Sequence, residues 1–145
     1  TGLWTDPTMK LVDTSVVVDI DRGGVDRRVS KLDGEGRHAI SVVTLTELRM
    51  GVNKQYEGDT EAHGEAMEAL ERLCARFETV DVTRPVAVRA ADIIAELQRR
   101  GEPLHDLHDV YIAATAMSEE LPVLTANVDR FERIGDVRVV DWADY

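Results

Sequence analysis

The stretch KLVDTSVVVD, residues 10–19, joins a short apolar run to an acidic residue and then to a second apolar run. Met9–Val12 is short and apolar, as is typical of a buried strand. Thr14–Asp19 predicts the start of a helix, and Asp13 lies at the junction between the two elements. A strand that passes directly into a helix indicates the first half of a βα unit.

The same alternation of short apolar strands and amphipathic helices continues along the chain. Further strands are predicted at His38–Val42, Thr79–Val82, Pro122–Leu124 and Val137–Val140. Helices are predicted at Val25–Leu32, Thr44–Val52, Thr60–Phe77, from an N-cap at Thr83 to Arg100, and at Asp106–Ser118, with the polar stretch Asn53–Gly64 as a loop. This order predicts an α/β fold with a central parallel sheet of about four to five short strands and helices on both faces.

Length and composition are those of a single globular domain. The 145 residues suffice to bury a core without a disulfide or metal staple. We expect this domain at residues 9–145, and residues 1–8 to be a native extension or an expression remnant. The single Cys74 suits a reducing cytoplasm. Neither a signal peptide nor an apolar run of the ~20 residues needed to span a membrane is evident.

The charge of the chain is strongly acidic, with a net value of −11. Acidic proteins are unusual partners for nucleic acids, because phosphate binding favours basic surfaces. Only three of the 17 basic residues are Lys. Acid-rich and Lys-poor surfaces suit molar salt, which screens charge within ~3 Å. A halophilic source is therefore our hypothesis, and highest stability at low salt in a melting series would contradict it.

Acidic and amide side chains follow several of the predicted strands. Asp13 comes directly after the first strand, and Glu47 and Asp109 lie in the first turns of predicted helices. Asn127 and Asp129 follow the fourth strand. In a parallel sheet the ligand site lies at the carboxyl ends of the strands, so we expect these side chains to meet there.

Carboxylates that meet in one cleft repel one another. At a separation of ~5 Å and an effective dielectric of ~20, each pair costs roughly 3 kcal/mol. A divalent cation removes this cost, and Mg²⁺ or Mn²⁺ suits oxygen ligands. A cation held in this way lowers the pKa of a bound water and neutralises charge on a leaving oxygen, which is the chemistry of phosphodiester hydrolysis.

Each carboxylate also has a purely structural interpretation. Asp13 is placed to cap the helix that follows it. Thr44 and Glu47 fit a capping box, and Asp106 is placed to cap the helix that contains Asp109. Capping alone does not explain why all of these residues fall at one edge of the predicted sheet.

Four stretches together resemble the motifs of PIN-domain nucleases. They are LVDTS (residues 11–15), ISVVTLTELRMG (40–51), HDVYIAATA (108–116) and LTANVDRFERI (124–134). Their order and spacing cover nearly the whole chain, and its compact length resembles the VapC-like toxins of toxin–antitoxin pairs. The resemblance implies a metal-dependent endoribonuclease that hydrolyses RNA, is usually a homodimer and is inhibited by a cognate antitoxin. It places metal ligands at Asp13, Glu47 and Asp109.

The fourth motif differs from that of many family members, which carry an acid where this chain has Asn127. We expect Asn127 to be the inner polar group of the site and hold Asp129 as a secondary candidate. Further candidates are the hydroxyls of Thr14, Ser15 and Thr125, which can orient a carboxylate or a metal-bound water, although capping of helix starts explains them equally well.

RNA binding has to rely on arginine, because aromatic residues are few. The candidates are Arg22, Arg27, Arg28, Arg49 and the pair Arg99–Arg100, of which Arg22 and Arg49 enter the predicted site. For each of them a solvated surface position is the simpler interpretation.

Three alternative functions stay open at this point. His105-Asp106 and His108-Asp109 form two His-Asp dipeptides, as in metal-dependent phosphohydrolases of the HD type, which need further His ligands. An acidic pocket of this kind also occurs in phosphoacceptor signalling domains, which need a nearby Lys. The third alternative is a PIN-like domain that serves as a scaffold without catalysis.

Overall fold

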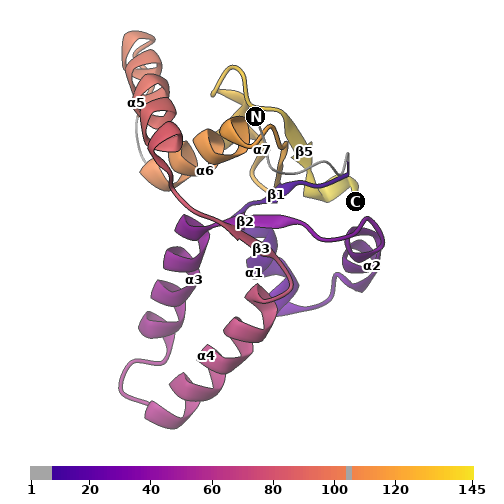
Figure 1. Ribbon diagram of the computed structural model, residues 1–145. Helices are drawn as coiled ribbons and strands as arrows, with labels where there is room; N and C mark the ends of the chain where they lie inside the picture. Colours follow the sequence, from indigo (N-terminus) through magenta and orange to yellow (C-terminus); the bar gives the residue numbers. More distant parts are fainter. Residues whose placement is uncertain (1–7, 104–105) are drawn as a thin grey trace.

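A computed structural model describes residues 8–103 and 106–145 (Figure 1). The strands are β1 Leu11–Val12, β2 Ala39–Ser41, β3 Glu78–Val80, β4 Val123–Thr125 and β5 Val139–Asp141. The helices are α1 Thr14–Arg22, α2 Asp26–Gly34, α3 Val42–Gln55, α4 Thr60–Cys74, α5 Arg84–Arg99, α6 Leu107–Ser118 and α7 Val128–Glu132, with a 3₁₀ turn at Trp142–Asp144. Residues 1–7, which belong to the predicted extension or remnant at residues 1–8, lie outside the described residues.

The strands form a five-stranded parallel sheet in the order β3-β2-β1-β4-β5. The central strand β1 pairs on one side with β2, through Leu11 and Ala39, and on the other side with β4, through Leu11 and Val123. The carboxyl ends of all the strands therefore lie at one edge. The predicted α/β fold with a parallel sheet is confirmed.

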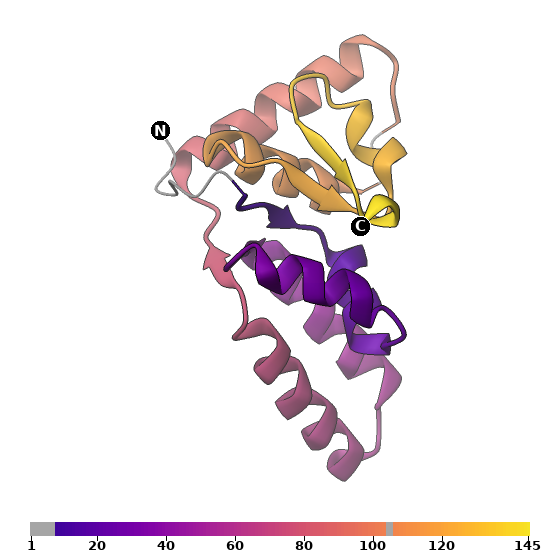
Figure 2. The ribbon, with the colours of Figure 1, turned by 90° about the vertical axis from the view of Figure 1, so that its right-hand side faces the viewer.

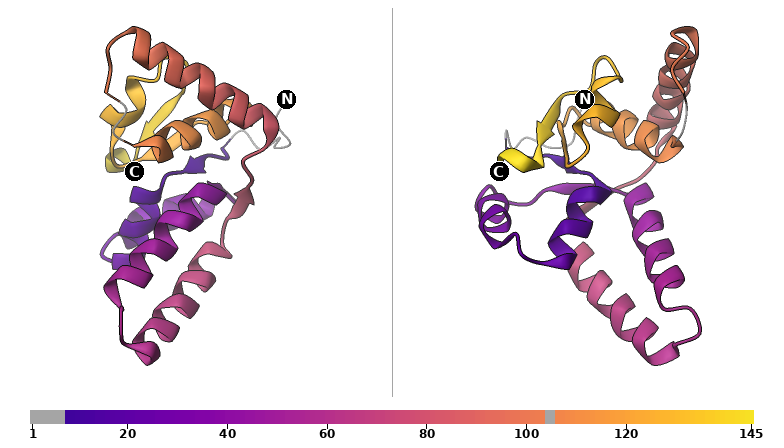
Figure 3. Two further views of the ribbon diagram at one scale, coloured as in Figure 1. Left: turned by 90° about the vertical axis from the view of Figure 1, so that its left-hand side faces the viewer. Right: turned by 180° about the vertical axis from the view of Figure 1, so that it is seen from behind.

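Helices cover both faces of the sheet, as predicted. Neighbouring residues of a strand point to opposite faces, so Leu11 joins one core and Val12 the other. The first core packs the sheet against α5, α6 and α7, and the second packs it against α1, α2, α3 and α4. Figures 2 and 3 show α5 and α6 on one side of the sheet and α1, α3 and α4 on the other, with α3 and α4 side by side. No described helix is long and apolar enough to cross a membrane.

The boundary between β2 and α3 differs from the prediction. Strand β2 ends at Ser41, whose side chain accepts a hydrogen bond from the backbone N–H of Val43 at 3.1 Å and caps α3. The predicted capping box of Thr44 and Glu47 is therefore wrong. The β-branched Val42 and Val43 suggested a longer strand, but the Ser41 cap starts the helix before them. Glu47 consequently lies in the second turn of α3 rather than the first.

Other boundaries move by a few residues. The polar stretch Asn53–Gly64 is mostly helical, because α3 continues to Gln55 and Asp59 caps α4 by accepting from the N–H of Ala62 at 3.0 Å. Helix α1 runs on to Arg22, and α4 ends at Cys74 instead of Phe77. The predicted N-cap of α5 at Thr83 is confirmed.

Candidate active site

Asp13 leaves the central strand at the carboxyl edge of the sheet and is buried. It occupies the N-cap position of α1, yet its carboxylate makes no capping hydrogen bond, so that part of the structural interpretation is wrong. Instead, its Oδ2 accepts from the hydroxyls of Ser15 and Thr125, each at 2.8 Å. These two donors come from α1 and from the end of β4, so they fix the carboxylate between two neighbouring strands.

Glu47 approaches from α3 and is half-buried. The Thr14 hydroxyl donates to its Oε1 at 2.7 Å and lies 3.0 Å from the hydroxyl of buried Thr44. Burial raises the pKa of Glu47, and the nearby Asp106 and Asp13 raise it further, against the lowering effects of Thr14 and His108. The charged form of Glu47 is thus held in place but is not fully compensated.

Asp109 lies in the first turn of α6 and is 6% exposed. Burial, together with the negative charges of Asp106, Asp13 and Glu47, raises its pKa to about 6. Arg130 opposes the shift from α7, with its Nη1 3.8 Å from Asp109 Oδ2. A buried carboxyl group with such a raised pKa is a feature of functional sites.

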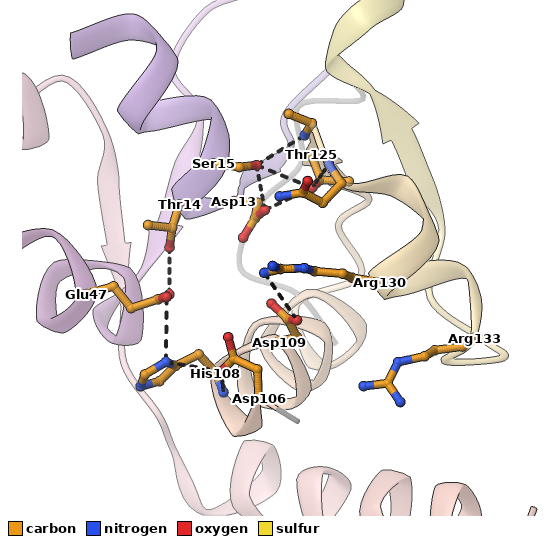
Figure 4. A network of polar contacts seen from close by, with 12 residues as sticks. Asp13, Thr14, Ser15, Glu47, Asp106, His108, Asp109, Thr125, Arg130 and Arg133 are labelled. Carbon is orange, nitrogen blue, oxygen red and sulfur yellow. Dashed lines mark hydrogen bonds and ion pairs between the residues drawn. The ribbon is translucent and has the colours of Figure 1, made fainter. Parts of the chain in front are cut away.

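The structure thus brings together Asp13, Glu47 and Asp109 from three separate elements (Figure 4). Both hydroxyl donors to Asp13 use Oδ2, and Arg130 faces Oδ2 of Asp109. Among the described residues, no hydrogen bond reaches the second carboxylate oxygen of Asp13 or of Asp109. The excess of negative charge and the oxygen atoms of these carboxylates suit a hard divalent cation.

Among the described residues, the acidic and histidine side chains whose ligand atoms lie within 4.8 Å of one another are Glu47, Asp106 and His108, so this closest group includes Glu47 but neither Asp13 nor Asp109. Asp106 caps α6 as predicted, by accepting from the N–H of His108 at 2.8 Å. The Nδ1 atom of His108 lies 3.2 Å from Asp106 Oδ1 and 3.5 Å from Glu47 Oε2. From the sequence, Asp106 is predicted as a helix cap and as part of a His-Asp dipeptide, but not as a member of the PIN-type site, because a capping residue and a ligand look alike in the sequence.

The residues of the fourth motif divide between the site and the surface. Thr125 is buried and takes part in the site through its bond to Asp13 and by accepting the N–H of Asn127 at 2.9 Å. Asn127 and Asp129 are exposed at the start of α7. Within residues 8–103 and 106–145 no hydrogen bond or ion pair joins either side chain to the three carboxylates. The fourth position of the site stays a prediction.

The arginine beside the carboxylates is not one of those proposed from the sequence. Arg22 is exposed in the last turn of α1, and Arg49 pairs with Glu71 across α3 and α4 at 3.6 Å. The arginine in contact with the site is Arg130. Its position in the fourth motif gave no signal, since it follows Asn127 by three residues and only the helix α7 turns it toward Asp109.

A phosphoacceptor domain needs a Lys beside the acidic pocket, and an HD-type phosphohydrolase needs further His ligands. Lys10 pairs with Glu35 at 3.1 Å, and Lys31 lies over the ring of Tyr145. Lys54 is exposed at the end of α3. None of the three Lys, all in the described part of the chain, contacts the carboxylates, as a phosphoacceptor site would need. His105 of the HD-type alternative lies outside the described residues.

Known proteins resemble this chain in sequence and in fold. The tRNA(fMet)-specific endonuclease VapC of Shigella flexneri is 33% identical over 109 residues, covering 75% of this chain and 78% of the relative. Ribonuclease VapC1 of Methanocaldococcus jannaschii is 32% identical over 124 residues, covering 86% and 79%. The solved DNA-bound VapBC of Salmonella typhimurium superposes with a TM-score of 0.76 at 31% identity, covering 92% of this chain and 98% of the other. The family model described as the PIN domain matches residues 10–137, and the chain therefore belongs to the PIN domain family.

Proposed function

We propose that this chain is an endoribonuclease that hydrolyses RNA with Mg²⁺ or Mn²⁺ and acts as the toxin of a toxin–antitoxin pair. The observation that carries the proposal is the convergence of Asp13, Glu47 and Asp109, with raised pKa values at Glu47 and Asp109. The ribonuclease names of the relatives support RNA as the substrate.

In this proposal Asp13, Glu47 and Asp109 would hold the divalent cation, which would activate a water and supply positive charge near the phosphate. Ser15 and Thr125 fix one oxygen of Asp13 and leave the other for the ion. Thr14 holds Oε1 of Glu47, whose Oε2 faces His108. The N-terminus of α6, which carries Asp109, adds a positive partial charge that favours the phosphate.

The proposal includes a protein partner and a compartment. Several solved relatives are VapBC structures, and one from Mycobacterium tuberculosis is described as a member of the VapBC family of toxin–antitoxin systems, which supports a cognate antitoxin. We further propose that the protein is a homodimer and is located in the cytoplasm. If the acidic surface is an adaptation to the environment, this cytoplasm is rich in salt. Light scattering that gives the 16.1 kDa mass of one chain would contradict the dimer.

RNA cleavage with and without divalent cation tests the activity. Purified protein is incubated with a tRNA and with an unstructured RNA in Mg²⁺, Mn²⁺ or EDTA. We expect the RNA to be cleaved at internal positions in the presence of either metal ion. We expect no cleavage in EDTA, because the carboxylates alone supply no nucleophile. Asp92 is an exposed acidic residue on α5, so Asp92→Asn is the matched control for an Asp→Asn substitution in the site. This control variant is expected to cleave RNA like the wild type.

Three results would change the assignment. Cleavage that persists in EDTA contradicts the metal mechanism. Hydrolysis of phosphomonoesters without RNA cleavage favours the phosphohydrolase alternative. A folded protein that binds the cation but hydrolyses neither class of substrate favours the non-catalytic scaffold or signalling domain.

The affinity for the cation is expected to depend on pH. A carboxylic acid has to lose its proton to bind a metal ion, and the pKa of Asp109 is raised to about 6. We expect the Mn²⁺ affinity to be constant above this value and to fall about tenfold for each unit below it, where binding releases one proton. Calorimetry in buffers of different ionisation enthalpy measures both quantities. An affinity that stays constant from neutral pH to pH 5 would rule out Asp109 as the titrating ligand.

A further inference from the structure

Arg130 places a positive charge directly on the candidate metal site. It extends from the short helix α7, and its Nη1 lies 3.8 Å from Asp109 Oδ2. Figure 4 shows its guanidinium in the space between Asp13 and Asp109. Although it contacts a buried carboxylate, the Arg130 side chain is 57% exposed, so it is free to swing into solvent.

Arg133, one helical turn further on, has no such role. Its Nη1 donates to the backbone carbonyl of Pro103 at 2.7 Å. Figure 4 shows its guanidinium apart from the carboxylates. The two arginines carry the same charge and differ in what they contact, so Arg133 provides a matched control for Arg130.

A divalent cation at the three carboxylates competes with Arg130 for Asp109. Two positive charges cannot share one carboxylate closely without repulsion, so binding of the ion weakens the contact with the guanidinium. By linkage, the contact with Arg130 must weaken binding of the ion by the same factor. The released guanidinium then lies beside an ion that attracts phosphate, on a chain whose net charge is −11.

We propose that Arg130 is a built-in counter-ion of the metal-free site, which the cation displaces and which then binds a phosphate of the RNA backbone. This inference rests on the proposed function. A guanidinium suits both partners, because its planar fork of N–H donors matches carboxylate and phosphate oxygens alike. Arg130 is thus a phosphate-binding residue whose partner changes with the state of the site.

The inference predicts two effects of Arg130→Gln that have opposite signs. Without RNA, calorimetry should show Mn²⁺ binding about two- to fivefold more tightly than to the wild type, the range expected for loss of an exposed ion pair. With RNA and saturating Mn²⁺, the RNA concentration that gives the half-maximal rate should rise about tenfold. The rise should shrink at high salt, because a backbone contact is screened.

Arg133→Gln is measured beside it and should leave both quantities unchanged. Mn²⁺ affinity in Arg130→Gln that equals that of the wild type or of Arg133→Gln would overturn the inference. The same holds if the Mn²⁺ affinity rises but the half-saturating RNA concentration does not. If the wild type itself neither binds Mn²⁺ nor cuts RNA, the proposed function fails, and this is distinguishable from a wild type that does both beside an Arg130→Gln variant that behaves like it.

Discussion

Asp109→Asn is expected to slow metal-dependent RNA cleavage about a thousandfold, a loss typical of removing one charge-stabilising group from a catalytic centre. Asn keeps the shape of the side chain in its buried position in α6 but removes the negative charge that the cation needs. Single-turnover cleavage at saturating Mn²⁺ measures the change. A variant with more than a tenth of the wild-type rate would show that Asp109 is not a metal ligand.

The same substitution is expected to stabilise the metal-free protein. The pKa of Asp109 is raised from its ordinary value of 3.8 to about 6. The unfolded chain therefore loses this proton first, and the stability of the folded state falls as the pH rises between the two values. Above about pH 6 the cost is fully present and amounts to on the order of 2–3 kcal/mol. Asp109→Asn removes this cost.

Denaturant unfolding in EDTA at pH 5 and pH 7.5 tests the sign. We expect the gain from Asp109→Asn to be larger at pH 7.5 than at pH 5, and added Mn²⁺ to stabilise the wild type but not the variant. A loss of stability at pH 7.5 would be incompatible with the raised pKa. Lost activity together with gained stability separates a functional residue from one that only maintains the fold.

Trp142→Ala is expected to cost the folded state about 3–5 kcal/mol, as for other large aromatic residues removed from a core. Trp142 follows β5, is 1% exposed and belongs to the core shared with α1–α4. Its ring lies 5.5 Å from that of Tyr145, and the Arg28 guanidinium lies over it at 5.7 Å. The midpoint of thermal unfolding should fall by roughly 10–15 °C.

Trp142→Phe is the companion variant. The indole Nε1 has no hydrogen-bond partner among the described residues, so most of the contribution of Trp142 is packing. Phe keeps much of that packing and should lose clearly less stability than Ala. Equal losses for the two variants would instead indicate that the indole nitrogen makes an important bond.

The alternation of strands and helices was predictable from the sequence, because each element carries its own apolar pattern. Asp13, Glu47 and Asp109 could be grouped for a similar reason, since a parallel sheet gathers the ends of its strands at one edge. Boundaries were less certain, as at Ser41, where a single side-chain hydrogen bond starts α3 ahead of two β-branched residues.

Contacts that depend on how a helix is oriented could not be predicted from the sequence. Arg130 reaches Asp109 across 21 positions of the chain only because α7 packs next to α6. Thr44 looked like a helix cap and is instead a buried partner of Thr14. In both cases the residue type permits several roles, and tertiary packing selects one of them.

The hydrogen bond between Thr125 and Asp13 joins residues that are 112 positions apart. During translation, Asp13 leaves the ribosome early but has no neighbouring β4 until Thr125 has also been synthesised. The nascent polypeptide therefore carries an incomplete site while the 112 positions between these residues are being synthesised. The candidate site of the nascent polypeptide is therefore completed only after the segment that contains Thr125 has been synthesised.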